Sequence, residues 1–152
     1  MKKFLKKIIC VSLLSVCLFK LEKVQSMVPY YYFPTTKNLK KESLSIGKSA
    51  YQLLYFGQVE ESLNLAKLAV KINTNNEKLW LILSETQVAN KLYKDALNSL
   101  NKAEDINPKI SEIYFAKSNI YLQISEEKSA KKALKRGLEL EPNNHKAIFQ
   151  LG

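Results

Sequence analysis

The C-terminal half of the sequence repeats itself at an interval of 34 residues. The recurring positions carry small, apolar or proline residues: Ala96, Leu100, Ala103 and Pro108 return as Ala130, Leu134, Gly137 and Pro142. Self-similarity at a fixed interval of this length is typical of stacked helix pairs, in which each unit packs only against its neighbours. The sequence therefore predicts an all-α solenoid of antiparallel helix pairs.

Apolar residues at three- and four-residue spacing from Ser43 onward mark the expected helices. We expect helix pairs at 38–56 with 58–73, at 77–90 with 93–106 and at 111–124 with 127–140, and a seventh helix from about 145. Gly57 separates the first pair, while Asn75-Asn76 and Asn143-Asn144 supply turns and caps. Carboxylates in the first turns of second helices complement the helix dipole, so we interpret them as caps rather than catalytic pairs: Glu60, Glu61, Asp95, Glu126 and Glu127.

Positive charge is concentrated at the start of the chain. The formal net charge is +10, and residues 1–41 hold nine lysines against the single acidic residue Glu22. Residues 42–152 hold fifteen basic and thirteen acidic residues, so the repeats are nearly neutral. Nucleic-acid binding requires basic side chains clustered along one face, and the repeats show no such stripe. We therefore expect no nucleic-acid partner.

Residues 1–26 have the composition of a targeting segment. An apolar run from Ile8 to Phe19 follows four lysines, and it fits a secretory signal but is short for a membrane-spanning helix of about 20 residues. Cleavage after Ser26 is the favoured interpretation, and the alternatives are an uncleaved membrane anchor or a lipoprotein acylated at Cys17. We expect a protein exported to a periplasm or lumen, or anchored facing that compartment, with possible membrane association through this segment.

Residues 27–41 form an aromatic linker in this interpretation. It contains Tyr30, Tyr31, Tyr32 and Phe33 between two prolines, which argue against a continuous helix. The favoured role is to cover the open face of the first helix. The alternatives are an interfacial aromatic belt at a bilayer and a peptide that docks in the protein's own groove.

The second and third units resemble the tetratricopeptide repeat family. Residues at family positions in unit 77–110 are Trp80, Leu83, Ser84, Ala96, Leu100, Ala103 and Pro108. In unit 111–144 they are Tyr114, Ser118, Tyr121, Ala130, Leu134, Gly137 and Pro142. Gln87 and Lys117 depart from the pattern, where the family has an aromatic residue and a leucine.

The terminal units match this pattern less well. Unit 43–76 has Ser62 and Thr74 where the family has alanine and proline, and residues 145–152 match only the opening of a fourth repeat. We therefore expect the chain to be a fragment or a prematurely ended reading frame. The resemblance implies a right-handed superhelix, in which Ala96 and Ala130 lie where paired helices approach.

The resemblance also implies a concave groove formed by the first helix of each pair. The groove positions are Tyr51, Leu54, Tyr55, Lys78, Leu81, Glu85, Val88, Glu112, Phe115, Asn119, Leu122 and Gln123. Their largely apolar composition suits an amphipathic helix or an extended segment. Family members that clamp a chaperone's C-terminal carboxylate use lysine, asparagine and arginine at positions occupied here by Gly47, Tyr51, Ile82, Glu112 and Ala116, so this clamp is absent.

Catalytic residues are not apparent. His145 is the only histidine, both cysteines (Cys10 and Cys17) lie in the apolar run, and the glycines form no phosphate-binding loop. We expect no cofactor or metal, and we interpret the basic run Lys131, Lys132, Lys135 and Arg136 as a solvated face.

The favoured function is therefore a non-enzymatic scaffold or assembly factor that binds a protein partner in the groove. The alternatives are the regulatory N-terminal region of a larger enzyme and a basic binder of membrane or nucleic-acid surfaces.

Overall fold

A computed structural model describes residues 36–151, with side chains from 38 to 150. The expected targeting segment (residues 1–26), with both cysteines, and the Tyr30–Phe33 cluster lie outside the described residues. The helices in the described part are α2 (Thr36–Tyr55), α3 (Val59–Ile72), α4 (Glu77–Ala89), α5 (Tyr93–Ile106), α6 (Ser111–Gln123), α7 (Glu127–Leu140) and α8 (His145–Leu151). The prediction of an all-α fold of helix pairs is confirmed.

The first helix begins earlier than the sequence predicts. Helix α2 starts at Thr36, two residues before the expected start at residue 38, and it therefore includes the last residues of the 27–41 linker. The last proline of that segment is Pro34, and no residue after it excludes a helix.

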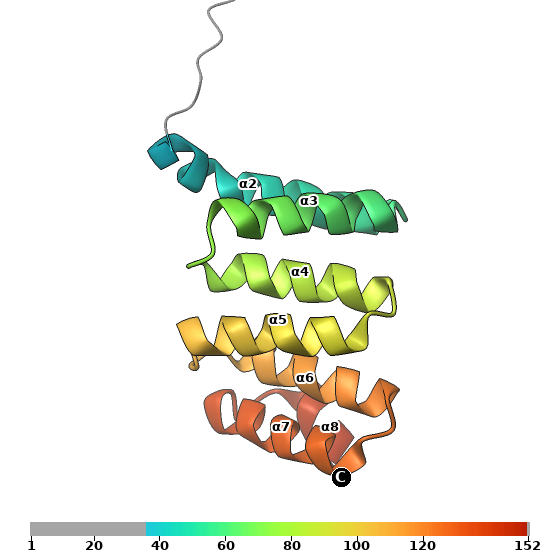
Figure 1. Cartoon of the computed structure of the whole chain (residues 1–152). Helices are drawn as coiled ribbons and strands as arrows, with labels where there is room; N and C mark the ends of the chain where they lie inside the picture. Colours follow the sequence, from blue (N-terminus) through green and yellow to red (C-terminus); the bar gives the residue numbers. More distant parts are fainter. Residues whose placement is uncertain (1–35, 152) are drawn as a thin grey trace, which may run out of the picture. The chain divides into compact units, whose positions relative to one another are not determined.

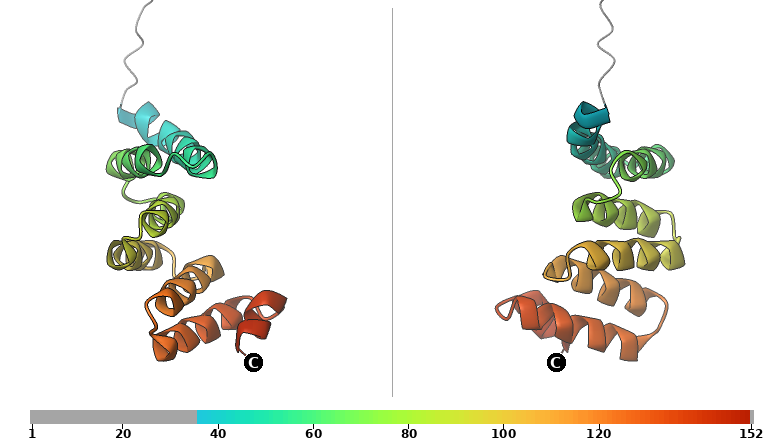
Figure 2. Two further views of the ribbon diagram at one scale, coloured as in Figure 1. Left: turned by 90° about the vertical axis from the view of Figure 1, so that its right-hand side faces the viewer. Right: turned by 60° about the vertical axis from the view of Figure 1, so that its left-hand side comes forward.

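The helices stack in the order of the sequence (Figures 1 and 2). Within pairs, α2 packs on α3, α4 on α5 and α6 on α7, and α8 packs on α7. Consecutive pairs are joined by α3 with α4 and by α5 with α6, and α2 also packs directly on α4. Trp80 packs against two clusters of buried side chains, one from α2, α3 and α4 and the other from α5 and α6. No helix in residues 36–151 combines the length and apolar character needed to cross a membrane.

Buried small residues allow the paired helices to approach. Ala96 is completely buried, as are Ala50 and Ser62 in the first pair. The Ser62 hydroxyl donates a hydrogen bond of 2.8 Å to the carbonyl of Ala50 on the facing helix. Serine is therefore accommodated at a family alanine position because its buried hydroxyl has a partner.

One hydrogen bond between units recurs at the repeat interval. Trp80 Nε1 donates to the Thr74 carbonyl at 2.8 Å, and 34 residues later Tyr114 Oη donates to the Pro108 carbonyl at 2.9 Å. Each aromatic side chain thus contacts the turn that precedes its own helix, which ties successive units together.

The three turns within pairs share one geometry. Gly57, Lys91 and Ser125 all have positive φ, at 77°, 59° and 62°. In each turn two backbone N–H groups donate back to the helix end, as in Lys91 N to Val88 O and Leu92 N to Gln87 O at 2.8 Å each. This is the Schellman arrangement, which normally favours glycine at the left-handed residue.

The two residues that depart from the family pattern, Gln87 and Lys117, are buried, and each has a polar partner. Gln87 accepts a hydrogen bond of 2.7 Å from the Ser99 hydroxyl. Lys117 forms an ion pair with Glu104 of the preceding unit, and only 10% of its side-chain surface is exposed. Within the described residues every buried side-chain nitrogen or oxygen has a hydrogen-bond partner.

Candidate functional site: a cleft between α4 and α6

An open cleft of about 430 Å³ lies between α4 and α6, next to the C-terminal half of α2. Its lining is largely apolar, with a carboxylate and two amides, and comprises Tyr51, Leu54, Ser84, Glu85, Val88, Ala89, Ala116, Asn119, Ile120 and Gln123. All three helices that line it are first helices of their pairs. The cleft is therefore on the face where the family resemblance places the groove.

Uneven helix packing accounts for the cleft. Helix α2 packs directly on α4, whereas no comparably close packing joins α4 to α6. Ser84, Ala89 and Ala116 have short side chains and leave the intervening space unfilled. The Ser84 hydroxyl already donates to the Leu81 carbonyl at 2.7 Å, so this residue mainly contributes space.

Half of the predicted groove residues line this cleft: Tyr51, Leu54, Glu85, Val88, Asn119 and Gln123. Three others, Lys78, Glu112 and Leu122, are exposed outside its lining. Tyr55 is 83% exposed and makes an edge-to-face contact with Phe56, with ring centroids 5.6 Å apart.

The remaining two predicted residues pack against other helices. Leu81 packs against the core cluster of α5 and α6. Phe115 is half-buried, and its ring lies so close to Gly137 on α7 that an added Cβ would stand 2.5 Å from Phe115 Cε1. The glycine at this position thus makes room for the ring.

The cleft lining includes residues that the groove prediction omits: Ser84, Ala89, Ala116 and Ile120. Ser84 and Ala116 could have been suspected, because small side chains on facing helices leave space between them. Nothing in the sequence distinguishes Ala89 or Ile120 from residues that only support packing.

Glu85 gives the cleft its electrostatic character. Partial burial of its carboxyl group raises the pKa, and the nearby negative charge of Glu112 raises it further. Tyr51, Asn119 and Gln123 are all exposed in the cleft and offer hydroxyl and amide groups. The site can thus hold an apolar group while hydrogen bonding to a polar backbone.

Close packing between α2 and α4 fills one position of the chaperone-type clamp. A Cβ added at Gly47 would lie 2.6 Å from Leu79 Cδ2 and 3.2 Å from Ile82 Cδ1. A larger residue at this position would require the side chain of Leu79 to shift. Glycine therefore lets the side chains of α4 pack closely against α2 at this clamp position.

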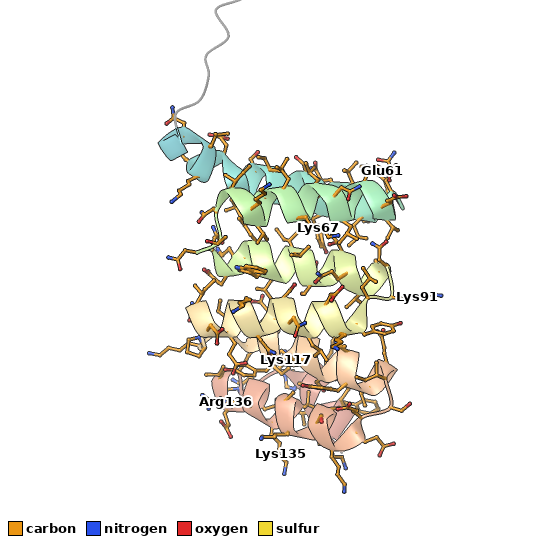
Figure 3. All side chains as sticks on the ribbon, viewed as in Figure 1. Glu61, Lys67, Lys91, Lys117, Lys135 and Arg136 are labelled. Carbon is orange, nitrogen blue, oxygen red and sulfur yellow. The ribbon has the colours of Figure 1, made fainter. Side chains whose placement is uncertain are left out.

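A second cavity, of about 390 Å³, is polar and lies on α5, α6 and α7. Its lining includes Glu104, Lys117, Tyr114 and Arg136, and the Arg136 guanidinium lies 5.8 Å from the centre of the Tyr114 ring. All four residues of the basic run on α7 are exposed, Lys132 and Arg136 at this cavity, and Figure 3 labels Lys135 and Arg136. His145 at the start of α8 is exposed as well. Within the described helices no three acidic, histidine or cysteine side chains are placed to hold a metal ion.

Residues 111–144 match the tetratricopeptide repeat family model. No curated protein sequence matches the chain. Among solved structures, the first tetratricopeptide domain of Spaghetti (RPAP3) bound to the HSP90 peptide SRMEEVD is similar with a TM-score of 0.70 and 21% identity, covering 74% of this chain and 89% of that one.

Two further solved structures are similar to this chain. For the type III secretion translocator chaperone SycD of Yersinia enterocolitica, the TM-score is 0.67 and the identity 17%, over 77% of this chain and 90% of that one. For PcrH in complex with the chaperone binding region of PopD, the TM-score is 0.65 and the identity 13%, over 70% of this chain and 86% of that one. The similarity to the tetratricopeptide repeat family model is therefore confined to residues 111–144, and the described helices share the fold of these solved structures.

Proposed function

We propose that this protein is a non-enzymatic scaffold or assembly factor that binds a segment of a partner protein in the cleft between α4 and α6. The observation that carries the proposal is the cleft itself, an apolar space with hydrogen-bonding groups at Tyr51, Asn119 and Gln123. Apolar side chains of a bound segment would lose contact with water there, while its backbone could bond to the amides.

The similar folds support this kind of partner. One similar domain is bound to an HSP90 peptide, and another to the chaperone binding region of PopD. A solenoid of helix pairs presents an extended concave surface, which suits a peptide segment better than a small molecule.

We also propose that the protein acts outside the cytoplasm or tethered to a membrane. The support is the sequence of its first 26 residues, in which four lysines precede the apolar run from Ile8 to Phe19. The N-terminus of the mature protein, measured by mass spectrometry after cell fractionation, tests this. A chain that retains Met1 in a soluble cytoplasmic fraction would contradict it.

Site-specific photocrosslinking tests the binding proposal. Asn119 is replaced by p-benzoylphenylalanine in the full chain, expressed in its native cells. The matched control carries the same replacement at Asn98, which is also exposed but lies on the second helix of a pair, outside the cleft lining. We expect position 119, and not position 98, to crosslink to one defined segment of a partner. Equal products from both positions, or none from position 119, would contradict the proposal.

A further inference from the structure

The cleft combines an apolar lining with an unpaired negative charge. Glu85 is exposed and lines the cleft together with Leu54, Val88 and Ile120, and Glu112 is close enough to act on it electrostatically. In residues 38–150 no ion pair joins either carboxylate to a lysine or arginine. The charge in the cleft is therefore not neutralised by the protein itself.

We infer that the segment bound in this cleft carries a lysine or arginine beside an apolar side chain, with the cation paired to Glu85. The inference rests on the proposed function and specifies the chemistry of the partner. The apolar side chain lies against Leu54 and Val88, and the cation neutralises a carboxylate that the cleft partly shields from water.

The energetics favour this partner over an uncharged or acidic one. Partial desolvation and the neighbouring Glu112 both work against a charged Glu85, as its raised pKa indicates. A cation from a partner offsets both effects through its attraction to the carboxylate, whereas an acidic segment adds a third negative charge.

The similar domain bound to an HSP90 peptide provides a contrast. That peptide, SRMEEVD, contains three acidic residues and one arginine, so acidic side chains predominate in it. In this protein the cleft presents Glu85, and the two clamp positions that line it are Tyr51 and Ala116, neither of which is basic. The inferred basic segment would therefore differ in net charge from that predominantly acidic peptide.

Peptide selection on the full chain tests the inference. A displayed library of random twelve-residue peptides is selected against four proteins. These are the wild type, Glu85→Gln with Glu112→Gln, Tyr51→Ala with Asn119→Ala, and the control Glu60→Gln with Glu61→Gln. The control removes two exposed carboxylates from α3, outside the cleft. Circular dichroism confirms that each variant is helical before selection.

We expect the wild type and the control to enrich lysine or arginine next to an apolar residue. The Glu85→Gln, Glu112→Gln protein should keep the apolar enrichment and lose the basic one, while the Tyr51→Ala, Asn119→Ala protein should lose both. Peptides that bind the wild type but not the Tyr51→Ala, Asn119→Ala protein depend on the cleft. If such peptides show no enrichment of basic residues, or show enrichment of acidic ones, the inference is overturned and the proposed function stands. Failure to obtain any cleft-dependent peptide would overturn both.

A thermodynamic cycle on one selected peptide then measures the pair directly. Replacing the peptide lysine by norleucine, or Glu85 by glutamine, should each weaken binding by about five-fold, the scale of a partly exposed charge pair. The two changes made together should weaken binding no more than either alone, because they remove the same interaction. Independent, multiplying losses would overturn the pairing with Glu85.

Discussion

The Lys117–Glu104 ion pair predicts an asymmetric response to mutation. The side chain of Lys117 is only 10% exposed, whereas that of Glu104 is 35% exposed and lines the polar cavity of about 390 Å³. Removing the carboxylate leaves a buried ammonium without its charge partner. Removing the ammonium leaves a carboxylate that water can reach through the cavity.

The magnitudes follow from these exposures. A hydrogen bond to a charged group contributes about 1.5–3 kcal/mol to the free energy of unfolding. Because the Glu104 carboxylate is partly exposed, solvent screening lowers the expected loss for Glu104→Gln to about 1–2 kcal/mol. At about 4 °C per kcal/mol for a domain of this size, the melting temperature should fall by about 4–8 °C. Lys117→Leu restores the residue type expected at this position and should stay within about 1 kcal/mol of the wild type.

Urea unfolding followed by circular dichroism at pH 7 measures both variants. The pH dependence provides a second readout. Burial by itself raises the pKa of Glu104, but the hydrogen bond and charge of Lys117, with smaller contributions from Tyr114 and Arg136, lower it below its ordinary value of 4.5. The stability from this group is therefore present above pH 4.5 and is lost as the pH falls through the lowered pKa.

The difference between the wild type and Glu104→Gln should thus narrow below pH 4.5. A larger loss of stability for Lys117→Leu than for Glu104→Gln at pH 7 would refute the reasoning, as would a difference that does not change with pH.

Three further predictions concern the turns, the core and the cleft. Gly57→Ala should lower the free energy of unfolding by about 1 kcal/mol, because φ is 77° there. Lys91→Gly, in the equivalent turn, should raise the free energy of unfolding by up to about 1 kcal/mol. Chemical denaturation measures both variants, and changes in the same direction would contradict the argument that a left-handed residue other than glycine is strained. Ala96→Leu should cost about 1–3 kcal/mol through overpacking at a fully buried site, seen as a lower melting temperature; an unchanged melting curve would contradict this helix–helix contact. Glu85→Gln should raise the free energy of unfolding at pH 7 by less than about 1 kcal/mol, because a folded-state pKa raised above 4.5 means that the charged carboxylate destabilises the fold. This gain should disappear as the pH falls through the raised pKa towards 4.5. Unfolding curves at several pH values check it.

Helix positions could be predicted because their signals are local. The 34-residue interval, apolar spacing and turn residues define each helix from neighbouring sequence. The predicted cap at Asn76 is present, and its side chain accepts a hydrogen bond of 3.0 Å from the Lys78 N–H. The left-handed conformation of Lys91 and Ser125 carries no such signal, because neither residue prefers it.

The cleft was harder to predict because it depends on contacts between helices distant in sequence. Family positions place Phe115 in the groove, but Gly137 lets its ring settle on α7. Lys117 stands out in the sequence as a mismatch, and its partner Glu104 lies 13 positions away on another helix. A pattern taken within one repeat cannot identify such partners.

The units are joined by interfaces of unequal extent, and this affects how the array bends and how cooperatively its units unfold. The first two units share contacts of α4 with both α2 and α3, whereas the second and third are joined mainly through α5 and α6. In a chain of nearest-neighbour couplings, that weaker joint is where cooperativity breaks first and where the array bends most readily. A segment bound between α4 and α6 would contact the second and third units at the same time. Occupation of the cleft would therefore stiffen the solenoid at this interface and make the two units unfold together.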